Sequence, residues 1–259
     1  GELMWMKELS EDTELNLPEV FTGKNCSLIQ KFPCESSGKI YRCCMFSFLE
    51  GTALKDLSGK ELFSQLEKTG AILAKLHIQS QTRDISRPLK RFSWDIDDLL
   101  GKDARWGNWR GNESLNKKQT EIIEKAVKRI TARVISFGKA ADKFGLIHAD
   151  LHCSNIIVSG DKLQILDFDD CGYGYFLYDF GCSLVEYSDE LEKAAEALIR
   201  GYERIKPLSR EEKKDVNTFI LLRRIVRLAW LAGHSQSDTA KTVSSGYIEK
   251  TCRLAEEFI

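Results

Sequence analysis

The stretch "LIHADLHCSNIIVSGDKLQILDFDD" at residues 146–170 joins a loop rich in polar side chains to the clearest hairpin in the chain. Two apolar runs, 156–158 and 163–166, flank the turn "SGD", a pattern typical of a tight antiparallel connection. In such a pair, the first residue of one strand faces the last residue of the other. Asn155 and Asp167 are therefore expected to meet at the open end of the hairpin.

Asp150 lies in the loop that enters this hairpin, so three oxygen-bearing side chains are expected to converge. Carboxylate and amide oxygens suit Mg²⁺, which keeps waters that phosphate oxygens can replace. The spacing H-x-D-L-x-x-x-N followed by D-F is that of the catalytic loop and metal aspartate of the protein-kinase fold. Taken singly, each residue could be an ordinary turn residue. Their joint spacing favours a catalytic site.

A zinc site is the alternative at the same loop. His148, Asp150 and His152 alternate along the chain, and on a strand they would offer three ligands on one face. The remaining histidines, His77 and His234, form no second cluster, and the cysteines lack the spacing of zinc ligands. The sequence thus disfavours a zinc hydrolase without removing it from consideration.

Almost the whole chain resembles the aminoglycoside phosphotransferase and homoserine/choline kinase-like group, which are small-molecule kinases with the protein-kinase fold. The paired motifs at 148–155 and 165–170 carry this resemblance. Weaker matches are "FLEG" at 48–51, "GAILAKLH" at 70–77 and "YDFG" at 178–181.

The resemblance implies an α+β, protein-kinase-like fold of two lobes. Residues 1–50 would be a partial N-terminal lobe with one helix and strands, and residues 51–259 a mainly helical C-terminal lobe, with a hinge at about 47–51. The family begins with a glycine-rich hairpin and a lysine that pairs with a helical glutamate. Glu2 stands at the position of that glutamate, and the sequence as given has no hairpin or lysine before it. The N-terminal sheet is therefore expected to be truncated.

The resemblance also assigns roles to the motif residues. Asp150 would orient or deprotonate the acceptor hydroxyl, while Asn155 and Asp167 would hold Mg²⁺ between the phosphates of ATP. His148 would brace the loop, and Asp179 would accept hydrogen bonds from the loop backbone.

A second group of implied residues lies near the N-terminus. The backbone of Ser47, Phe48 and Leu49 would meet the adenine edge of the nucleotide, and Glu2 would support the phosphate-binding side. A further four residues stay ambiguous. Asp169 and Asp170 could join the metal site or face solvent. Trp106 and Trp109 could line a substrate pocket or hold a long loop against the surface.

The implied function is an ATP-dependent phosphotransferase that acts on a hydroxyl of a small molecule, such as an amino-alcohol, amino acid, aminoglycoside or sugar. Only eleven residues separate Asp167 from Asp179, and no A-P-E motif closes a peptide-binding segment. Two alternatives remain: a non-catalytic kinase-like nucleotide-binding or scaffold protein and, less favoured, an atypical protein serine/threonine kinase.

Charge and hydropathy limit the partners. The chain has 38 basic and 39 acidic residues, so no broad cationic face is expected for nucleic acid or anionic lipid. The longest apolar stretch, at 219–233, is interrupted by Arg223, Arg224 and Arg227, which disfavours a membrane span. Arg223 and Arg227, one helical turn apart, could attract an anionic substrate or simply be solvated. Eight cysteines without a C-x-x-C pair suggest reduced thiols and a cytoplasmic location, whereas the oligomeric state stays open.

Helical patterns dominate after residue 52. Ser58 with Glu61, and Ser209 with Glu212, have the spacing of capping boxes. Strands are expected in "SLIQKF" and "KIYRCCMFSFL", around the turn "CESSG". The expected helices end at about His77 or span about 117–140, 189–204, 210–232 and 239–258.

Overall fold

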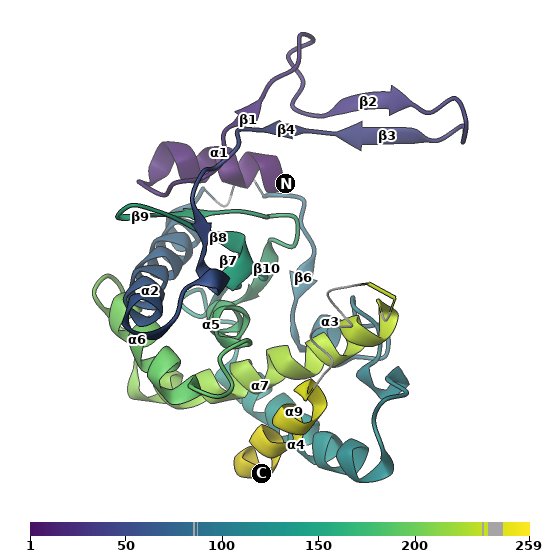
Figure 1. The fold of residues 1–259 in the computed structure, drawn as a ribbon, viewed down its shortest axis with the longest axis vertical. Coiled ribbons are helices and arrows are strands. Elements are labelled where there is room, and N and C mark those ends of the chain that lie inside the picture. Colours follow the sequence, from purple (N-terminus) through teal and green to yellow (C-terminus); the bar gives the residue numbers. More distant parts are fainter. Residues whose placement is uncertain (85, 87, 235, 238–245) are drawn as a thin grey trace.

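The structure is a computed structural model that describes residues 1–259 except 85, 87, 235 and 238–245. A mainly helical body carries a slender arm of strands, which projects beyond the first helix (Figure 1). The elements of this N-terminal part are α1 (Glu2–Asp12), β1 (Val20–Phe21), β2 (Gln30–Pro33), β3 (Ile40–Cys43) and β4 (Met45–Phe46).

The arm is the predicted hairpin with two differences. β2 and β3 pair antiparallel, with Gln30 opposite Cys43, and every residue of β3 is exposed. The second predicted run breaks at Cys44 into β3 and β4. The segment before the hairpin contributes β1, which the sequence pattern missed and which pairs with β4. These strands are only two residues long, so they carry no visible alternation.

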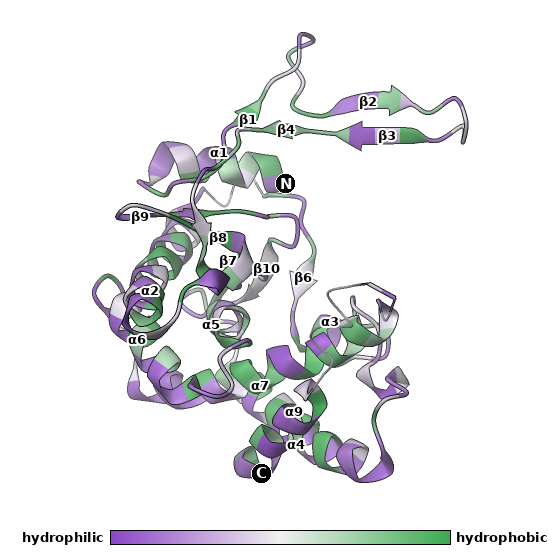
Figure 2. Ribbon diagram, viewed as in Figure 1, coloured by the Kyte–Doolittle hydropathy of each residue, from purple (hydrophilic) through white to green (hydrophobic). Residues whose placement is uncertain are grey.

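The body contains six long helices and several short elements among the described residues. The helices are α2 (Gly59–Thr82), α4 (Lys117–Phe137), α5 (Phe176–Leu184), α6 (Leu191–Glu203), α7 (Arg210–Gly233) and α9 (Tyr247–Phe258). The short helices are α3 (Ile96–Leu100), η1 (Leu54–Asp56), η2 (Trp109–Gly111) and η3 (Cys153–Asn155). In Figure 2, polar and apolar residues alternate around α2, α4 and α6, as expected for amphipathic helices with one buried face.

Two three-stranded sheets lie next to the loops that carry the predicted site residues. The first has the order β5-β8-β9, with β5 (Thr52–Ala53), β8 (Ile156–Ser159) and β9 (Lys162–Ile165). Ile156 lies opposite Ile165, which confirms the predicted hairpin but shifts its register by one residue, because Asn155 then lies opposite Leu166 and not Asp167. The second sheet has the order β6-β10-β7, with β6 (Ser93–Trp94), β7 (Phe144–Ile147) and β10 (Gly172–Tyr175). The sequence analysis did not predict these three strands.

Of the two predicted helix capping boxes, one is present in the structure and the other is absent. The capping box of Ser209 and Glu212 is confirmed, with hydrogen bonds of 2.8 and 3.1 Å. The prediction of a capping box at Ser58 and Glu61 is wrong, because the Ser58 side chain makes no capping hydrogen bond. Gly59, the first helical residue, has a left-handed φ of 58°, which turns the backbone out of the geometry that such a box needs.

Helix lengths also differ from the predictions. α2 continues to Thr82, past the predicted end at about residue 77, while α4 stops at Phe137 where Gly138 takes a positive φ. α6 begins at Leu191 rather than at 189. The last predicted helix is present as α9, and residues 239–245 of that prediction lie outside the described residues.

The core depends on a close crossing of α2 and α6. A Cβ on Gly201 would lie 1.7 Å from the carbonyl oxygen of Glu67, and one on Gly70 would lie 2.0 Å from that of Leu198. The two glycines therefore let the helix backbones meet. This contact fixes α2, which supplies the buried His77 to the site described below.

Two further expectations concern the cysteines and the membrane. All eight cysteines are described and none forms a disulfide, in agreement with the prediction of free thiols. Over the described residues, no helix has both the length and the hydropathy that a bilayer crossing requires.

The crossing can be tested with Gly201→Ala. The added methyl group would overlap the Glu67 backbone, so the free energy of unfolding should fall by about 2 kcal/mol or more. Gly233→Ala is the matched control, because nothing lies within 4 Å of its Cβ position and alanine favours a helix. Urea unfolding measures both, and equal stability of the two variants would contradict the proposed crossing.

Candidate active site

The predicted residues meet at the open end of the β8–β9 hairpin. The N–H of Leu166 donates to the carbonyl of Asn155 at 2.9 Å, which continues the ladder toward Asp167. The Asn155 side-chain amide donates to the main-chain carbonyl of Asp150 at 3.0 Å. The carboxyl of Asp167 lies close enough to Asp150 for repulsion between them to affect its pKa. The structure thus brings Asp150, Asn155 and Asp167 together, and their chemical roles stay predictions.

A buried carboxylate on α5 holds the loop before Asp150. Asp179 accepts hydrogen bonds from the backbone N–H groups of His148 at 3.1 Å and Ala149 at 2.7 Å. Its third contact is Nε2 of His77 at 3.2 Å, while Nδ1 of His77 faces the Tyr202 hydroxyl at 2.9 Å. Burial lowers the pKa of His77, so the ring is neutral and donates its one N–H to the carboxylate.

The loop backbone is strained at two positions. Ala149 and Asp167 have left-handed φ angles of 66° and 64°, which side-chain-bearing residues rarely adopt. The thiol of Cys182 donates to the carbonyl of Ala149 at 2.8 Å, and the hydroxyl of Ser183 donates to that of Leu151 at 2.7 Å. Such strain persists where surrounding contacts over-determine it, and it concentrates at functional sites.

His148 occupies the bracing position that the resemblance implied. The ring is fully buried, and burial lowers its pKa, so it is neutral. Its Nε2 donates to the Leu166 carbonyl at 2.9 Å, and its Nδ1 accepts from the Asp150 N–H at 3.3 Å. The ring also packs on Phe168, with centroids 4.5 Å apart. His148 therefore ties the catalytic loop to the segment that carries Asp167.

These contacts weigh against the zinc alternative. Residues 148–152 form a loop, so the three side chains do not alternate on one strand face, contrary to that hypothesis. Both ring nitrogens of His148 are engaged with the protein. Across the described part of the chain, no three His, Cys, Asp or Glu side chains form a ready-made metal cage.

Asp150 lies between the side chains of Arg223 and His152. Its Oδ1 accepts from Arg223, and its Oδ2 lies 3.5 Å from Nε2 of His152. Burial alone would raise the pKa of Asp150, but Arg223 and His152 outweigh it, and the net pKa is lowered. Burial would lower the pKa of His152, but the contact with Asp150 raises it to about 9. At neutral pH the site thus holds an ionised Asp150, while Nδ1 of His152 accepts from the Ser154 N–H at 3.2 Å.

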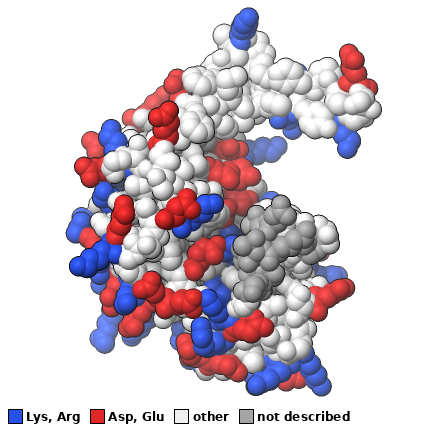
Figure 3. Space-filling model, in the orientation of Figure 1, with Lys and Arg blue, Asp and Glu red and all other residues white. Residues whose placement is uncertain are grey.

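Unpaired carboxylates gather beside this loop. Burial, followed by repulsion from Asp169 and Asp150, raises the pKa of Asp167 to about 6. Burial and the same two neighbours raise the pKa of Asp170 to about 7. Figure 3 shows acidic side chains in the hollow between the arm and the body. Mutual repulsion of this kind is relieved when a divalent cation binds, so the donor set fits Mg²⁺.

The Asn155 amide also suits a metal. Its Nδ2 is turned toward Asp150, which leaves the Oδ1 atom as a free acceptor on the opposite side. Mg²⁺ is commonly held by one or two protein oxygens together with substrate phosphates and water. The pair Asn155 and Asp167 is therefore sufficient without a closed protein cage.

One backbone donor of the predicted adenine-contacting segment is already used within the protein. The Ser47 N–H already donates to the Glu19 carbonyl at 2.9 Å, so the structure removes this donor from the set that could meet a base. The Ser47 carbonyl and the backbone of Phe48 and Leu49 have no hydrogen bond in the structure, and the Phe48 side chain is 88% exposed. These groups keep the predicted role as a proposal.

Glu2 faces the same hollow from α1. Burial raises its pKa, Arg91 opposes this shift and Asp169 adds to it. Arg91 in turn donates to the carbonyls of Cys171 and Asp169. Glu2 thus lies near the segment that follows Asp167, and the cation that influences its pKa is Arg91, which the sequence analysis had not singled out.

The ambiguous residues can now be placed. Asp169 is exposed and Asp170 is half-buried next to the loop. Trp109 is buried and clamps its loop, which excludes it as a pocket wall. Trp106 is half-buried and stacks on Trp94 at 6.4 Å, and Trp94 stacks on Tyr178 at 6.3 Å.

Sequence reasoning did not separate Arg223 from Arg227. Arg223 reaches Asp150, whereas Arg227 forms an ion pair with Glu186 away from the loop. Helical spacing put both on one face, and both lie in the same apolar stretch, so no local signal separated them.

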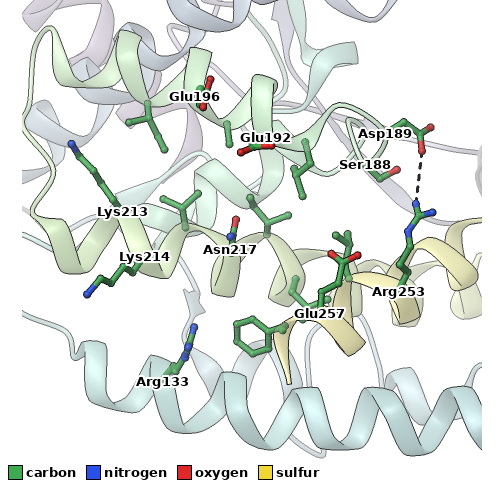
Figure 4. A pocket seen from close by; sticks show the side chains of 18 of the residues that line it. Arg133, Ser188, Asp189, Glu192, Glu196, Lys213, Lys214, Asn217, Arg253 and Glu257 are labelled. Carbon is green, nitrogen blue, oxygen red and sulfur yellow. Dashed lines mark ion pairs between the residues drawn. The ribbon is translucent and has the colours of Figure 1, made fainter.

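One cavity of the described structure lies away from the candidate site. It has a volume of about 1070 Å³ between α4, α6, α7 and α9 and is lined by charges of both signs (Figure 4). A second cavity of about 680 Å³ lies between the end of α1 and α2. Neither contains a residue of the candidate site, so cavity size does not mark the chemistry here.

The chain is similar to known proteins in both sequence and fold. Residues 1–212 match the Phosphotransferase enzyme family, which is most of the chain. The chain belongs to this family. Its relatives include the amicoumacin kinase of Bacillus subtilis, 23% identical over 186 residues that are 71% of this chain and 51% of that protein. A homoserine kinase of Rhizobium etli is 26% identical over 178 residues, 65% of this chain and 50% of that protein. The chain spans about half the length of the curated relatives it matches.

Solved structures confirm the predicted protein-kinase-like α+β fold. A microcompartment-associated aminopropanol kinase superposes with a TM-score of 0.88 and 29% identity, over 99% of this chain and 80% of that one. A spectinomycin phosphotransferase superposes with a TM-score of 0.65 and 15% identity, over 99% and 82%. The second likeness concerns the fold alone.

The raised pKa of Asp170 predicts a pH-dependent stability. Between about pH 4 and 7 the folded carboxyl stays protonated while the unfolded one is ionised, so stability falls as pH rises. Asp170→Asn should remove this penalty and raise the Tm at pH 8 by about 2–4 °C, equivalent to about 1 kcal/mol.

Thermal unfolding at pH 4 and pH 8 measures the effect. The difference between Asp170→Asn and the wild type should vanish at pH 4. Asp161→Asn, in the exposed turn of the hairpin, is the control without such a difference. A gain for Asp170→Asn that is the same at both pH values would contradict the assignment.

Proposed function

We propose that the protein transfers the γ-phosphoryl group of ATP to a hydroxyl of a small molecule, namely an amino-alcohol. The observation that carries the proposal is the convergence of Asp150, Asn155 and Asp167 at one end of the hairpin. Membership of the Phosphotransferase enzyme family supports the reaction type. A cytoplasmic location, drawn from the free thiols, is part of the proposal.

The residues divide the chemistry as follows. Asp150 accepts a hydrogen bond from the acceptor hydroxyl and aligns its oxygen for attack. Its lowered pKa suits orientation and late acceptance of the proton, since a weak base removes little of the proton beforehand. Asn155 and Asp167 hold Mg²⁺, which supplies charge neutralisation for the phosphate oxygens. His148 and Asp179 keep the loop in place.

The choice of acceptor rests on two supports. The aminopropanol kinase is the structural neighbour with 29% identity across nearly the whole chain. Asp170 also lies close enough to Asp150 for their charges to interact, and its carboxylate, which has no hydrogen-bond partner within the described part of the chain, would attract an ammonium group. Amino acids, aminoglycosides and sugars are the other acceptors to compare.

The first experiment separates transfer from mere binding. Thermal stabilisation of the full-length protein by ATP, with and without Mg²⁺, precedes a phosphate-transfer screen over amino-alcohols, amino acids, aminoglycosides and sugars. Transfer to at least one amino-alcohol is expected. Stabilisation by nucleotide with transfer to none of them would favour the non-catalytic binding protein, and transfer to a protein hydroxyl alone would favour a protein kinase.

Asp150→Asn tests the acceptor-side role. The amide keeps the shape but loses the charge, so kcat should fall by about 100-fold or more while the KM for ATP changes little. Steady-state kinetics with the best acceptor measure this. An unchanged kcat would rule out the role given to Asp150.

Asp167→Asn tests the metal side. In the wild type, Mg²⁺ should increase the Tm shift caused by a non-hydrolysable ATP analogue, because ligand binding to the folded state stabilises it. In the variant this Mg²⁺-dependent increment should disappear. Asp161→Asn, at the opposite end of the same hairpin, should keep it. Full retention of the increment in Asp167→Asn would place the metal elsewhere.

A further inference from the structure

Helix α7 places one guanidinium directly against the catalytic loop. Arg223 lies in the middle of α7, which runs beside α5, and its side chain is only 11% exposed. Its Nη2 donates to Oδ1 of Asp150 at 2.5 Å, and its Nη1 donates to the Tyr178 hydroxyl at 3.3 Å. A buried cation therefore contacts the residue on which acceptor chemistry would depend.

A glycine on α5 allows the Arg223 side chain to lie deep between α5 and α7. A Cβ on Gly181 would lie 2.4 Å from the Phe219 carbonyl oxygen and 3.1 Å from Cβ of Arg223. The bare backbone at Gly181 lets α7 approach α5 closely, and Arg223 then extends into the space behind Asp150. The contact is built by helix packing and not by a mobile surface arginine.

The two neighbouring arginines on α7 have different partners. Arg224 donates to the Val185 carbonyl at 2.8 Å and to the Thr251 hydroxyl at 3.1 Å, which ties α7 to α5 and α9. Arg227 pairs with Glu186 at 2.5 Å. Arg223 is the member of this trio that contacts the loop, so Arg227 offers a matched control one helical turn away.

The ion pair makes the two oxygens of Asp150 unequal. Oδ1 is engaged in the short contact with Arg223. Oδ2 has longer contacts, 3.4 Å to Nδ2 of Asn155 and 3.5 Å to Nε2 of His152. A carboxylate anchored through one oxygen in this way presents the other in a fixed direction.

We propose that Arg223 is a positioning residue that anchors Oδ1 of Asp150 so that Oδ2 faces the acceptor hydroxyl. This inference rests on the proposed phosphotransfer. Arg223 acts through Asp150 and touches neither nucleotide nor acceptor. Directional anchoring of this kind matters because a displacement of about 1 Å in a reacting group can cost about 100-fold in rate.

The incomplete bonding of Arg223 argues against a purely stabilising role. Its Nε is buried and has no hydrogen-bond partner among the described residues, which leaves the cost of its desolvation uncompensated. Buried ion pairs are also weak contributors to stability compared with apolar side chains of similar size. A guanidinium retained at this depth with a donor unsatisfied is better explained by what it does to Asp150.

The test compares Arg223→Met, Arg223→Lys and Arg227→Met in the full-length protein. Arg223→Met should lower kcat about 100-fold with the KM for ATP within about twofold of wild type. Arg223→Lys keeps the charge without the fork, so it should recover part of kcat, and it serves as the test variant if Arg223→Met does not fold. Arg227→Met should have kcat within about twofold of wild type.

Crystal structures of the same variants give a readout that does not need turnover. The Asp150 carboxylate should rotate away from its wild-type direction in Arg223→Met and stay in place in Arg227→Met. If the wild type transfers phosphate to no acceptor, the proposed function fails, and the Asp150 orientation alone decides the role of Arg223. An unmoved Asp150, or an unchanged kcat with a tenfold higher KM for the acceptor, would overturn the proposal.

Discussion

The site depends on one buried carboxylate, that of Asp179, which is fully removed from solvent. A buried charge needs donors, and Asp179 obtains two from the backbone of residues 148 and 149 and one from His77. These bonds hold the loop in the left-handed turn that brings Asp150 to the end of the hairpin. If the carboxylate were lost, the loop would have unpaired N–H groups and a strained residue without support.

Local patterns in the sequence predicted the hairpin and the meeting of its ends. The hairpin strands are four residues each and joined by a tight turn, so the turn residues mark the hairpin, although its register differs by one residue from the predicted pairing. Helix α7 was predictable for a similar reason, since Ser209 and Glu212 form their capping box within one turn. Such features need no knowledge of distant segments. The convergence of Asp150, Asn155 and Asp167 followed from them.

Features set by distant contacts escaped the sequence. Arg223 and Asp150 are 73 residues apart, and their pairing arises from the packing of α7 on α5. The sheet of β6, β10 and β7 includes "GYGY", whose glycines give no strand signal, and β6 has only two residues. Ser58 failed as a cap because the φ of Gly59 is not encoded in the spacing of Ser58 and Glu61. The two side chains are similarly buried, and only their partners, Asp150 for Arg223 and Glu186 for Arg227, distinguish them.

The strand β10 lies between the segment of Asp167 and the buried Asp179, and it pairs along its full length with β7. Of the eleven residues between the two aspartates, 172–175 belong to β10 and 176–178 to the first turn of α5. Little slack remains for this connection to refold between alternative states. Switching by rearrangement of this segment, as in enzymes with a long activation loop, would require the sheet to be unzipped. This short, sheet-bound connection therefore keeps the two aspartates in a fixed relation to each other.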